Sequence, residues 1–396
     1  MAGLSITAVA DDLTGAAEIA AIGHRYGLPA VICTRTGRSS EQSGLTVYDT
    51  DSRLVPAAEA TLRLEALGYI VSENRPRLTY KKTDSVLRGN VAAELLALAR
   101  SLGFRRVLLV PANPSLGRTT RSGEYFINDV PLHETAFARD PHHPVHSASL
   151  IALLGNSPGF PVAVIKPGDP LPNHGIVLGE TATSADVEHW AGLLDPQTLP
   201  AGGAEFFEAC LKQQRLTSCT TAAPTVNGPM LVITGALTPA RQKLLAHAAT
   251  ADWPCLPMPR TLANNTKHDA SKIWIHRLAF LLNKHQLAIT ESPRIALEDN
   301  AAAERIRRAF GDAVCLLHDR HAFGHLIVEG GATAAAIAEA AGWSSFDVLG
   351  AWAPGVISLR PIAPNAPVFT LKPGSYSWPE NLWHQLDTSS QSNAHS

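Results

Sequence analysis

The stretch 5-SITAVADDLTGAAEIAAIGHRYG-27 combines a short apolar run, two adjacent acids and an alanine-rich segment with a helical period. The run Ile6–Ala10 lacks polar alternation, which is typical of a parallel strand that is covered on both faces. The small residues of 14-TGA-16 then provide free backbone N–H groups at the start of a helix. The stretch therefore predicts a strand, a tight turn and a helix, with Asp11 and Asp12 at the carboxyl end of the strand.

Strand and helix patterns alternate along the rest of the chain. Further apolar runs that are bounded by Gly, Pro or Asp predict strands at 107–110, 162–165, 176–178, 231–233 and 326–328. Amphipathic segments predict helices at 92–102, 184–194, 204–212, 239–249 and 332–341, the first with Asn90 as its N-cap. This alternation predicts α/β architecture with largely parallel sheets.

The chain is long enough for two domains, and a polar stretch that contains proline separates its halves. Its 396 residues are 45% hydrophobic, which is enough to fill two cores. The stretch 217-TSCTTAAPTVNGP-229 lies between a predicted helix and a new strand. We therefore predict domains at residues 1–226 and 227–390, followed by a disordered tail at 391–396.

Charge and composition exclude several classes of protein. Charged residues make up 17% of the chain and nearly cancel to a formal net charge of −2, so no basic excess indicates nucleic-acid binding. No run reaches the ~18 apolar residues of a membrane helix, and the N-terminus lacks the pattern of a signal peptide. Five cysteines without a CxxC spacing fit reduced thiols better than disulfides or a zinc site. These features predict a cytoplasmic enzyme without nucleic-acid or membrane partners.

Asp11 and Asp12 follow the first predicted strand, at the place where ligands bind in open α/β sheets. Two adjacent carboxylates there can accept a proton from a substrate, hold hydroxyl groups or bind a cation. The alternative is that one aspartate caps the helix while the other is solvated. Spacing alone leaves both interpretations open.

The stretch 80-YKKTDSVLRGN-90 concentrates hydrogen-bond donors and acceptors beside a tight turn, with Lys82, Asp84 and Arg88 only a few positions apart. Lysine and arginine together suit carboxylate or phosphate groups, and arginine binds such groups through two parallel hydrogen bonds. The stretch favours a ligand site over a structural network of ion pairs, which is the alternative.

A long polar segment, 111-PANPSLGRTTRSGEYFINDVPLHETAFARDPHHPV-145, follows the predicted strand at 107–110. Loops of this length in compact domains are usually functional or disordered, and its aromatic residues argue against disorder. Its candidate site residues are Arg118, Thr119, His133, Glu134, Thr135, Arg139 and Asp140. The histidines of this region lack a metal-ligand spacing, so we interpret them as loop-packing residues: His142, His143 and His146.

Two strand–glycine–helix segments occur in the second half, 231-LVITGALTPARQ-242 and 326-LIVEGGATAAAIAEAAG-342. A glycine turn that opens a helix binds phosphate through backbone amides and the positive helix end. Neither segment is a Walker A loop, and the absence of GxGxxG disfavours a dehydrogenase, which is one alternative α/β enzyme. Together with the glycine turn of 371-LKPGSYS-377, the segments favour a nucleotide site, although glycine also serves close helix–strand packing.

Taken together, these stretches resemble the four-carbon acid sugar kinase family, formerly catalogued as a domain of unknown function. Its members carry ADDxTGA after the first strand, then KxDSxxRGN, then a long segment with GRTT and VPLHETxFARDP. This chain has 10-ADDLTGA-16, 82-KTDSVLRGN-90, 111-PANPSLGRTT-120 and 130-VPLHETAFARDPHHPV-145. Long matches in the same order over most of the first domain are more specific than any single short motif.

The resemblance implies two α/β domains with a ligand cleft between them. The first would bind a sugar acid and the second a nucleotide, and phosphate would pass from ATP, with Mg²⁺, to a hydroxyl in that cleft. Family members act on D-threonate, D-erythronate or 3-oxo-tetronates, and the terminal hydroxyl is the expected acceptor. The oligomeric state stays open, with a homodimer as one candidate.

The residues that match the family motifs receive roles as hypotheses. Asp12 would take the proton of the attacking hydroxyl or orient that hydroxyl, and Lys82 and Arg88 would neutralise the carboxylate or the incoming phosphate. Asp11 would bind the substrate beside these three catalytic residues, and Asp84 would position its hydroxyl groups. No role is assigned to position 53. Backbone N–H groups would hold the nucleotide phosphates at Gly235, Gly330, Gly331 and Gly374.

The second domain departs from the family pattern. The family's GSxS turn is 235-GALT-238 here, and its GG[ED]TA is 330-GGATA-334, with Ala332 in place of the acid. Backbone binding of phosphate survives these changes, whereas a side-chain role for the missing acid does not. Glu329 lies nearby, but neighbouring side chains on a strand point to opposite faces. The alternative function is therefore a sugar-acid-binding protein without turnover.

Overall fold

The chain divides into two compact units, Met1–Thr220 (unit 1) and Thr221–Ser396 (unit 2). The computed structural model describes residues 4–34, 43–140, 143–155, 157–219, 224–225, 228–235, 238–264, 268–294, 299–374 and 376–391. The domain boundary predicted between residues 226 and 227 lies outside the described residues, as does the predicted tail from residue 392 onward. Both therefore stay predictions.

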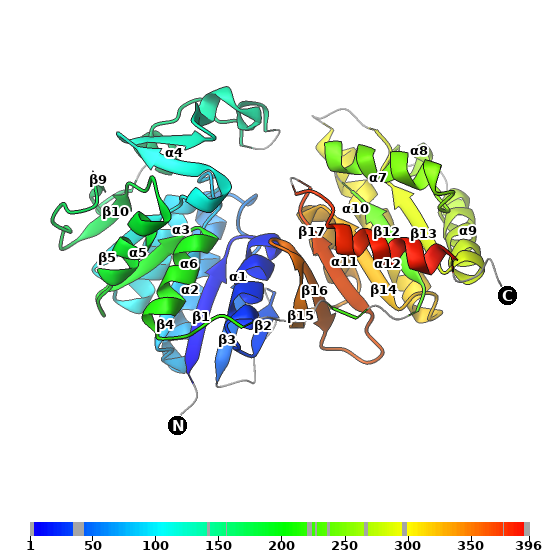
Figure 1. Cartoon of the computed structure of the whole chain (residues 1–396), viewed down its shortest axis with the longest axis horizontal. Coiled ribbons are helices and arrows are strands. Elements are labelled where there is room, and N and C mark those ends of the chain that lie inside the picture. Colours follow the sequence, from blue (N-terminus) through cyan, green and yellow to red (C-terminus); the bar gives the residue numbers. More distant parts are fainter. Residues whose placement is uncertain are drawn as a thin grey trace. The chain divides into compact units, whose positions relative to one another are not determined.

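Unit 1 is built on a parallel sheet with the strand order β2-β3-β1-β4-β11-β5-β10-β9. Its strands are β1 (Ser5–Ala10), β2 (Ala30–Cys33), β3 (Gly44–Asp49), β4 (Leu78–Lys82), β5 (Arg106–Val110), β9 (Val162–Ile165), β10 (Gly175–Gly179) and β11 (Thr198–Gly202). Its helices are α1 (Leu13–Arg25), α2 (Ala57–Asn74), α3 (Val91–Leu102), α4 (Leu150–Leu154), α5 (Ser184–Gly192) and α6 (Ala204–Gln213). In Figure 1, α1, α5 and α6 cover one face of this sheet and α2 and α3 the other.

The strand order reverses at β1, because β3 pairs with one side of β1 and β4 with the other. The next strands along the chain then extend the sheet away from β1 beyond β4. Such a switch point leaves a crevice beyond the carboxyl ends of the strands, where ligands bind in open α/β sheets.

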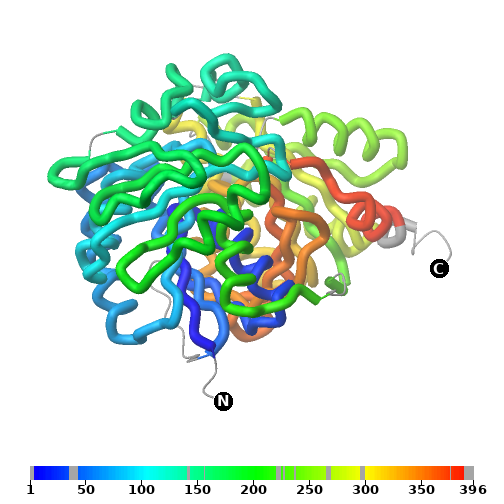
Figure 2. The backbone as a smooth tube through the Cα atoms, turned by 60° about the vertical axis from the view of Figure 1, so that its left-hand side comes forward, coloured from blue at the N-terminus to red at the C-terminus, as the bar shows by residue number. Residues whose placement is uncertain are grey.

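The segment 111–145, which the sequence predicts as a long loop, forms a small antiparallel sheet and short helical turns instead. Its elements are η1 (Pro114–Leu116), β6 (Arg118–Arg121), β7 (Glu124–Ile127), β8 (Val130–Pro131), η2 (Leu132–Glu134) and η3 (Ala136–Arg139). Two tight turns with positive φ at both central residues connect its strands, Ser122–Gly123 (φ 51° and 76°) and Asn128–Asp129 (φ 48° and 63°). Turns of this hand match the twist of a hairpin, and their chemistry is the signal that the sequence prediction overlooked. This excursion lies at one end of unit 1 (Figures 1 and 2).

Unit 2 has a mostly parallel sheet with the order β13-β12-β14-β17-β16-β15, in which the β17-β16 and β16-β15 pairs are antiparallel. Its strands are β12 (Met230–Thr234), β13 (Leu287–Glu291), β14 (His325–Glu329), β15 (Ser345–Ala353), β16 (Val356–Pro361) and β17 (Val368–Lys372). Its helices are α7 (Pro239–Thr250), α8 (Arg260–Ala263), α9 (His268–His285), α10 (Asn300–Asp319), α11 (Gly331–Ala340) and α12 (Glu380–Gln391).

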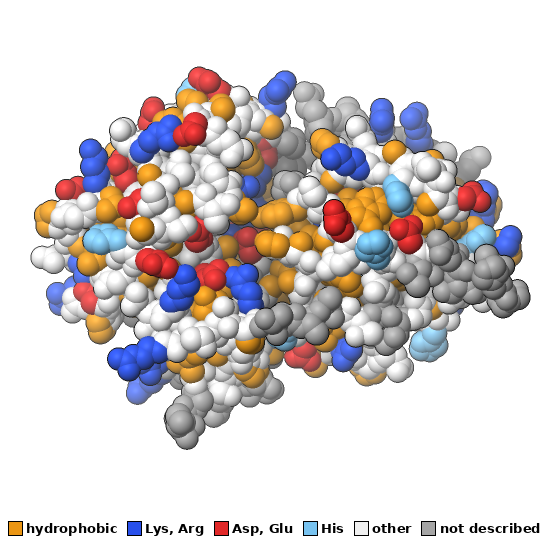
Figure 3. Space-filling model, in the orientation of Figure 1, with side chains coloured by type: hydrophobic (Ala, Val, Ile, Leu, Met, Phe, Trp, Pro, Cys, Tyr) orange, Lys and Arg blue, Asp and Glu red, His pale blue; other side chains and the backbone are white. Residues whose placement is uncertain are grey.

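The helices α7 and α12 pack on one face of the unit 2 sheet. Leu244 of α7 and Leu382 of α12 are fully buried in a core that also contains Val232 of β12. On the face of unit 2 that Figure 3 presents, hydrophobic side chains gather between these two helices. The core on this face thus extends towards the surface around Trp383, which is half-buried.

The predicted architecture is confirmed, since every predicted strand and helix is present with ends shifted by a few residues. Asn90 precedes α3 as predicted, but its side chain makes no capping hydrogen bond to the helix. Its amide donates instead to the carbonyl oxygens of Ser52 and Val55, at 2.9 and 2.8 Å, and so fastens the loop after β3. None of the helices within the described ranges is long and apolar enough to cross a membrane.

His325 makes the stability of unit 2 depend on pH. Its ring is fully buried and its Nε2 lies 2.6 Å from Thr370 Oγ1, and burial lowers its pKa from 6.5 to about 3. Because the folded state resists protonation, the stability that the neutral ring supports is present above pH 6.5 and is lost as the pH falls towards about 3. We expect His325→Gln to reduce the slope of unfolding free energy against pH by up to about 1.4 kcal/mol per pH unit in this window. Urea titrations of both proteins at neutral and mildly acidic pH measure the slopes, and equal slopes would contradict the expectation.

Candidate functional site

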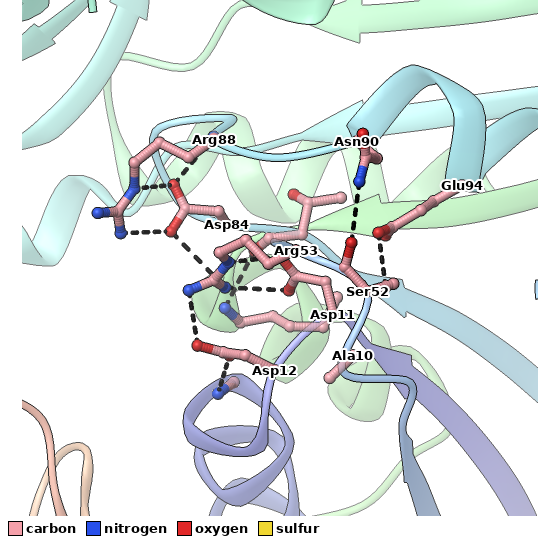
Figure 4. A network of polar contacts seen from close by, with 12 residues as sticks. Ala10, Asp11, Asp12, Ser52, Arg53, Asp84, Arg88, Asn90 and Glu94 are labelled. Carbon is pink, nitrogen blue, oxygen red and sulfur yellow. Dashed lines mark hydrogen bonds and ion pairs between the residues drawn. The ribbon is translucent and has the colours of Figure 1, made fainter. Parts of the chain in front are cut away.

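Three segments of unit 1 meet beyond the carboxyl ends of β1, β3 and β4. The register pairs Ala10 with Asp49 and Val9 with Lys81, so the residues that follow these strands lie side by side. Figure 4 shows the polar network that results, with side chains from the β1–α1 turn, the loop after β3 and the turn after β4 pointing toward one another. The topological switch point of the sheet thus carries the predicted cluster of acids.

Arg53 is the centre of this network, and the sequence analysis missed it. Its guanidinium donates to both oxygens of Asp11, from Nε at 2.7 Å and from Nη2 at 3.1 Å. Its Nη1 donates to Asp12 Oδ2 at 2.6 Å, and its Nη2 lies 3.7 Å from Asp84 Oδ2. A signal was available, because the polar residues 50-TDSR-53 directly follow β3, just as the two acids follow β1.

Asp12 caps α1, as one of the two interpretations predicts, and its role towards a ligand stays a prediction. Its Oδ1 accepts a hydrogen bond from Gly15 N at 2.7 Å while its Oδ2 binds Arg53. A Cβ on Gly15 would lie 2.9 Å from Asp12 Oδ1, so glycine is what permits this close approach. The other part of the capping interpretation is wrong, because Asp11 is buried rather than solvated.

The two neighbouring acids respond differently to burial. Burial raises the pKa of Asp11, but the charges of Arg53 and Lys81 outweigh it, and the net pKa is lowered. Burial also raises the pKa of Asp12, and the adjacent Asp11 carboxylate adds to the increase, so that Arg53 does not reverse it. Asp12 is therefore the more basic of the two carboxylates, as proton acceptance requires.

Arg88, predicted to bind a ligand anion, is already held by two carboxylates. Its Nε and Nη2 donate to the two oxygens of Asp84 at 3.0 and 2.7 Å, and its Nη1 donates to Asp140 at 2.7 Å. Burial raises the pKa of Asp84, but Arg53 and Arg88 lower it well below its usual range. The structural ion-pair network that the sequence left as an alternative is present here, and a ligand role for Arg88 stays a prediction.

Lys81 and Lys82, which are adjacent on β4, point to opposite faces of the sheet. Lys82 Nζ lies 3.2 Å from Glu18 Oε2 of α1 and donates to the carbonyl of Thr83 at 3.1 Å. Burial lowers the pKa of Lys82, but the charges of Glu18 and of the acids of the network outweigh this effect. The net pKa is raised, so the amine stays charged. Lys81 is fully buried, and its Nζ lies 2.7 Å from Glu94 Oε2 of α3.

The Lys81–Glu94 pair fixes the loop that carries Arg53. Glu94 Oε1 accepts a hydrogen bond from Ser52 Oγ at 2.6 Å, and Ser52 precedes Arg53 in the chain. Burial raises the pKa of Glu94, and Lys81 opposes this increase. A second ion pair, the fully buried Lys81–Glu94, therefore holds the loop that carries Arg53 in place.

Few of the candidate residues in 111–145 reach the network. Asp140 binds Arg88, Phe137 lies 5.1 Å below the same guanidinium, and Arg118 Nη1 donates to Ser85 Oγ. Two of the other candidates stabilise the excursion itself: Thr119 pairs with Phe126 in its sheet, and Thr135 caps η3. The remaining candidates are exposed, namely His133, Glu134 and Arg139. His142 lies outside the described residues, and His143 and His146 line a cavity of about 460 Å³ next to Arg88. Among the described residues no group of three or more His, Cys, Asp or Glu side chains is placed to hold a metal ion.

The predicted glycines of unit 2 gather around Glu329 at the carboxyl end of β14. Gly235 N donates to the carbonyl of Glu329 at 2.9 Å, and a Cβ on Gly235 would lie 2.0 Å from Thr333 Oγ1. Gly330 has φ +110° and precedes Gly331, the first residue of α11. Gly330 N likewise donates to the carbonyl of Lys372 at 2.9 Å, so the amides of Gly235 and Gly330 hold the turns together and are not open to a ligand as predicted. Gly331 places its amide at the start of α11, the position at which helices bind phosphate. Gly374 follows β17 in the neighbouring turn.

Glu329 points into the group of glycine turns. The buried Lys372 Nζ lies 2.8 Å from Glu329 Oε1, and Thr238 Oγ1 donates to the same oxygen at 3.0 Å. The other oxygen, Glu329 Oε2, is buried and has no hydrogen-bond partner among the described residues. Ala332 is exposed in the first turn of α11. The orphaned oxygen fits a nucleotide, because a ribose hydroxyl or a water on Mg²⁺ would complete its hydrogen bonding.

Known families match both units of the chain. Residues 6–189 match a family model described as a sugar-binding N-terminal domain, and residues 231–376 match one described as a nucleotide-binding C-terminal domain. The chain belongs to the four-carbon acid sugar kinase family. This assignment confirms the resemblance that the motifs of the first half indicate.

Characterised members of the four-carbon acid sugar kinase family are similar to the chain over most of its length. A D-threonate kinase of Cupriavidus necator is 28% identical over 98% of both chains, and one of Salmonella typhimurium is 24% identical over 89% of this chain and 90% of its own. A D-erythronate kinase of Heliobacterium modesticaldum is 33% identical over 41% of this chain and 40% of its own.

Two solved structures share the fold. One from Salmonella typhimurium has a TM-score of 0.79 at 19% identity and covers 98% of both chains. One from Haemophilus influenzae has a TM-score of 0.74 at 19% identity and covers 97% of this chain and 99% of its own.

Removing Arg53 should destabilise unit 1 in a pH-dependent way. Arg53→Ala leaves Asp11, Asp12 and Asp84 without their shared countercharge, so we expect a loss of about 3–5 kcal/mol of unfolding free energy at neutral pH. The loss should shrink as the pH falls, because the uncompensated acids then become protonated. Urea titrations at two pH values test this expectation.

The matched control is Arg121→Ala, which removes a surface arginine that pairs with the exposed Asp129. Its cost should be about 1 kcal/mol or less. Equal losses for the two variants would show that Arg53 has no special structural role.

Proposed function

We propose that this protein is an ATP-dependent kinase that phosphorylates a hydroxyl of a four-carbon sugar acid such as threonate, erythronate or a 3-oxo-tetronate. The observation that carries the proposal is the pairing of two matched domains, one sugar-binding and one nucleotide-binding. The relatives named above are kinases of D-threonate and D-erythronate. The terminal hydroxyl is the proposed acceptor, the cytoplasm the proposed location, and a homodimer stays a prediction.

The acidic network of unit 1 suits a polyhydroxy acid. Hydroxyl groups donate hydrogen bonds to carboxylates, and Asp11, Asp12 and Asp84 lie around one guanidinium at the switch point. Lys82 adds a buried positive charge beside the first turn of α1, where it would offset the carboxylate of the sugar acid or the incoming phosphate. In this arrangement Arg53 keeps the acids ionised and in place.

Asp12 is the proposed general base. It is partly accessible, whereas Asp11 is buried, and it is the more basic of the two carboxylates. Its Oδ1 accepts a hydrogen bond from Gly15 N and its Oδ2 accepts one from Arg53, so the side chain cannot rotate away. Phosphoryl transfer depends on such positioning and on charge neutralisation more than on covalent help from the protein.

The glycine turns of unit 2 are the proposed phosphate site. The backbone amides of Gly331, at the start of α11, and of Gly374 would hold the nucleotide phosphates, while the amides of Gly235 and Gly330 hold the turns in shape. ATP would enter as its Mg²⁺ complex, so the metal would arrive with the substrate and supply charge neutralisation at the phosphates. Direct transfer also requires the cleft between the domains that the family resemblance implies, and this cleft stays a prediction.

Asp12→Asn should abolish most of the turnover. General-base catalysis contributes about 10²–10⁴-fold, so we expect ATP consumption with the best sugar acid to fall by about 100-fold or more. Asn keeps the capping oxygen for Gly15, so the fold should persist. In the wild type, the acid limb of the pH–rate profile should lie above pH 3.8, because the pKa of Asp12 is raised from that value.

The control for Asp12→Asn is Asp129→Asn, which changes an aspartate whose side chain is 85% exposed. It should retain wild-type turnover. A folded Asp12→Asn protein with full activity would remove Asp12 from the chemistry.

A second candidate function is sugar-acid binding without turnover, and Ala332 is the observation that favours it. Calorimetry separates the two functions: we expect the wild type to bind Mg-ATP, because Glu329 supplies a carboxylate within the group of glycine turns. Intact binding of a sugar acid with no binding of Mg-ATP would support the second function instead.

A further inference from the structure

Helix α2 of unit 1 carries large apolar side chains on the face that it turns to solvent. Its inner face is already packed, because Leu64 and Val71 are buried in the core of unit 1. Leu62 and Tyr69, in contrast, are each 66% exposed. They lie seven residues apart and therefore on one line along the helix. An aligned pair of this kind on an 18-residue helix is typical of a contact surface, whereas apolar residues that are exposed singly are common.

Helix α9 of unit 2 repeats this arrangement (Figure 1). Its inner face is packed as well, because the buried ring of Trp274 lies 6.0 Å from the buried ring of Phe310 in α10, measured between centroids. Ile273 and Phe280, again seven residues apart, are 61% and 60% exposed. Both helices are 18 residues long, so each offers a surface of about 27 Å in length. The two surfaces therefore match in length and in the spacing of their apolar residues.

The charges beside the two apolar rows have opposite signs. The exposed Glu65 and Glu73 lie beside the row of α2, whereas the exposed Arg277 and Lys284 lie beside the row of α9. Glu73 and Lys284 occupy the same position, four residues after the second apolar residue of each row. Opposite charges nearer the start of each helix cancel, namely Glu59 and Arg63 on α2, and Asp269 and Lys272 on α9. Two surfaces of this kind attract each other, and either one repels a copy of itself.

We infer that α2 of one copy of this chain binds α9 of a second copy, so that the two apolar rows pack together. Each chain carries one surface of each kind, and two copies that make the contact twice form a closed dimer. Tyr69 and Arg277 are of the residue types that contribute most to the affinity of such interfaces. The inference does not depend on the proposed function, and it gives the predicted homodimer a location.

Sedimentation velocity over a range of protein concentrations tests the inference, and we expect the full wild-type chain to sediment as a dimer. Leu62→Lys places a positive charge opposite the basic α9, and Phe280→Glu places a negative charge opposite the acidic α2. We expect each variant alone to bind its own copies about 100-fold more weakly and to sediment as a monomer. Because both positions are exposed, the circular dichroism spectra should stay unchanged. The matched control is Ile362→Lys, at a residue that is 59% exposed and lies outside both helices, and it should remain dimeric.

A mixture of the two variants identifies the partner surface. The Leu62→Lys protein keeps α9 intact, and the Phe280→Glu protein keeps α2 intact. A mixture therefore restores one complete contact and brings the two introduced charges, which are of opposite sign, together at the other. We expect the mixture to contain dimers although each variant alone is monomeric.

Four outcomes would overturn the inference. The first is a wild-type protein that stays monomeric at about 100 μM, where a dimer with a Kd of about 10 μM is largely formed. Dimers that persist in both variants would place the contact elsewhere, and a loss in only one variant would indicate a contact between like helices. A mixture that stays monomeric would show that the two surfaces do not bind each other. The measurement needs neither ATP nor a sugar acid, so none of these outcomes affects the proposed kinase function.

Discussion

The guanidinium of Arg53 allows three carboxylates to lie close together in unit 1. Three carboxylates converge at the ends of β1 and β4, and without a countercharge their mutual repulsion and desolvation would favour protonation. Arg53 contacts Asp11 with two hydrogen bonds and Asp12 with one, and it lies near Asp84. The positions of the surrounding elements follow from this constraint, since the loop that carries Arg53 is tied through Ser52 to Glu94 and Lys81. The switch point is thus held together by the buried Lys81–Glu94 pair and by the partly exposed ion pairs of Arg53.

Asp12 has both an observed structural role and a proposed chemical role. It follows the last residue of the first strand by two positions, and its side chain caps the first helix and carries the more basic carboxylate of the pair. Helix caps usually involve serine, threonine, asparagine or aspartate. Among these, only aspartate both accepts the hydrogen bond from Gly15 and offers a carboxylate to a substrate hydroxyl. The cap alone therefore does not require aspartate at this position of the family motif, whereas the proposed role as a general base does.

Much of the architecture could be predicted from local patterns, because buried parallel strands leave uninterrupted apolar runs and helices leave a period of 3.6 residues. The site was harder, since Arg53 approaches Asp11 and Asp12 only after the chain has passed through β2 and β3. An ion pair between Arg88 and Asp84 is the alternative that the spacing leaves open, but the second partner of Arg88, Asp140, comes from a distant segment that spacing cannot locate. The sequence predicts a loop at 111–145 because the turns of this excursion depend on positive φ at Ser122 and Asn128, which a hydrophobicity pattern does not reveal.

The excursion between β5 and α4 makes the polar network depend on a segment that lies outside the sheet. The sheet and its first turns supply Asp11, Asp12 and Arg53, whereas Asp140, Phe137 and Arg118 arrive from a small hairpin with its own buried residues. These three contacts come from the GRTT and VPLHETxFARDP motifs that family members share. Local unfolding of the excursion would therefore release Arg88 from Asp140 while the strand register of the sheet stays intact.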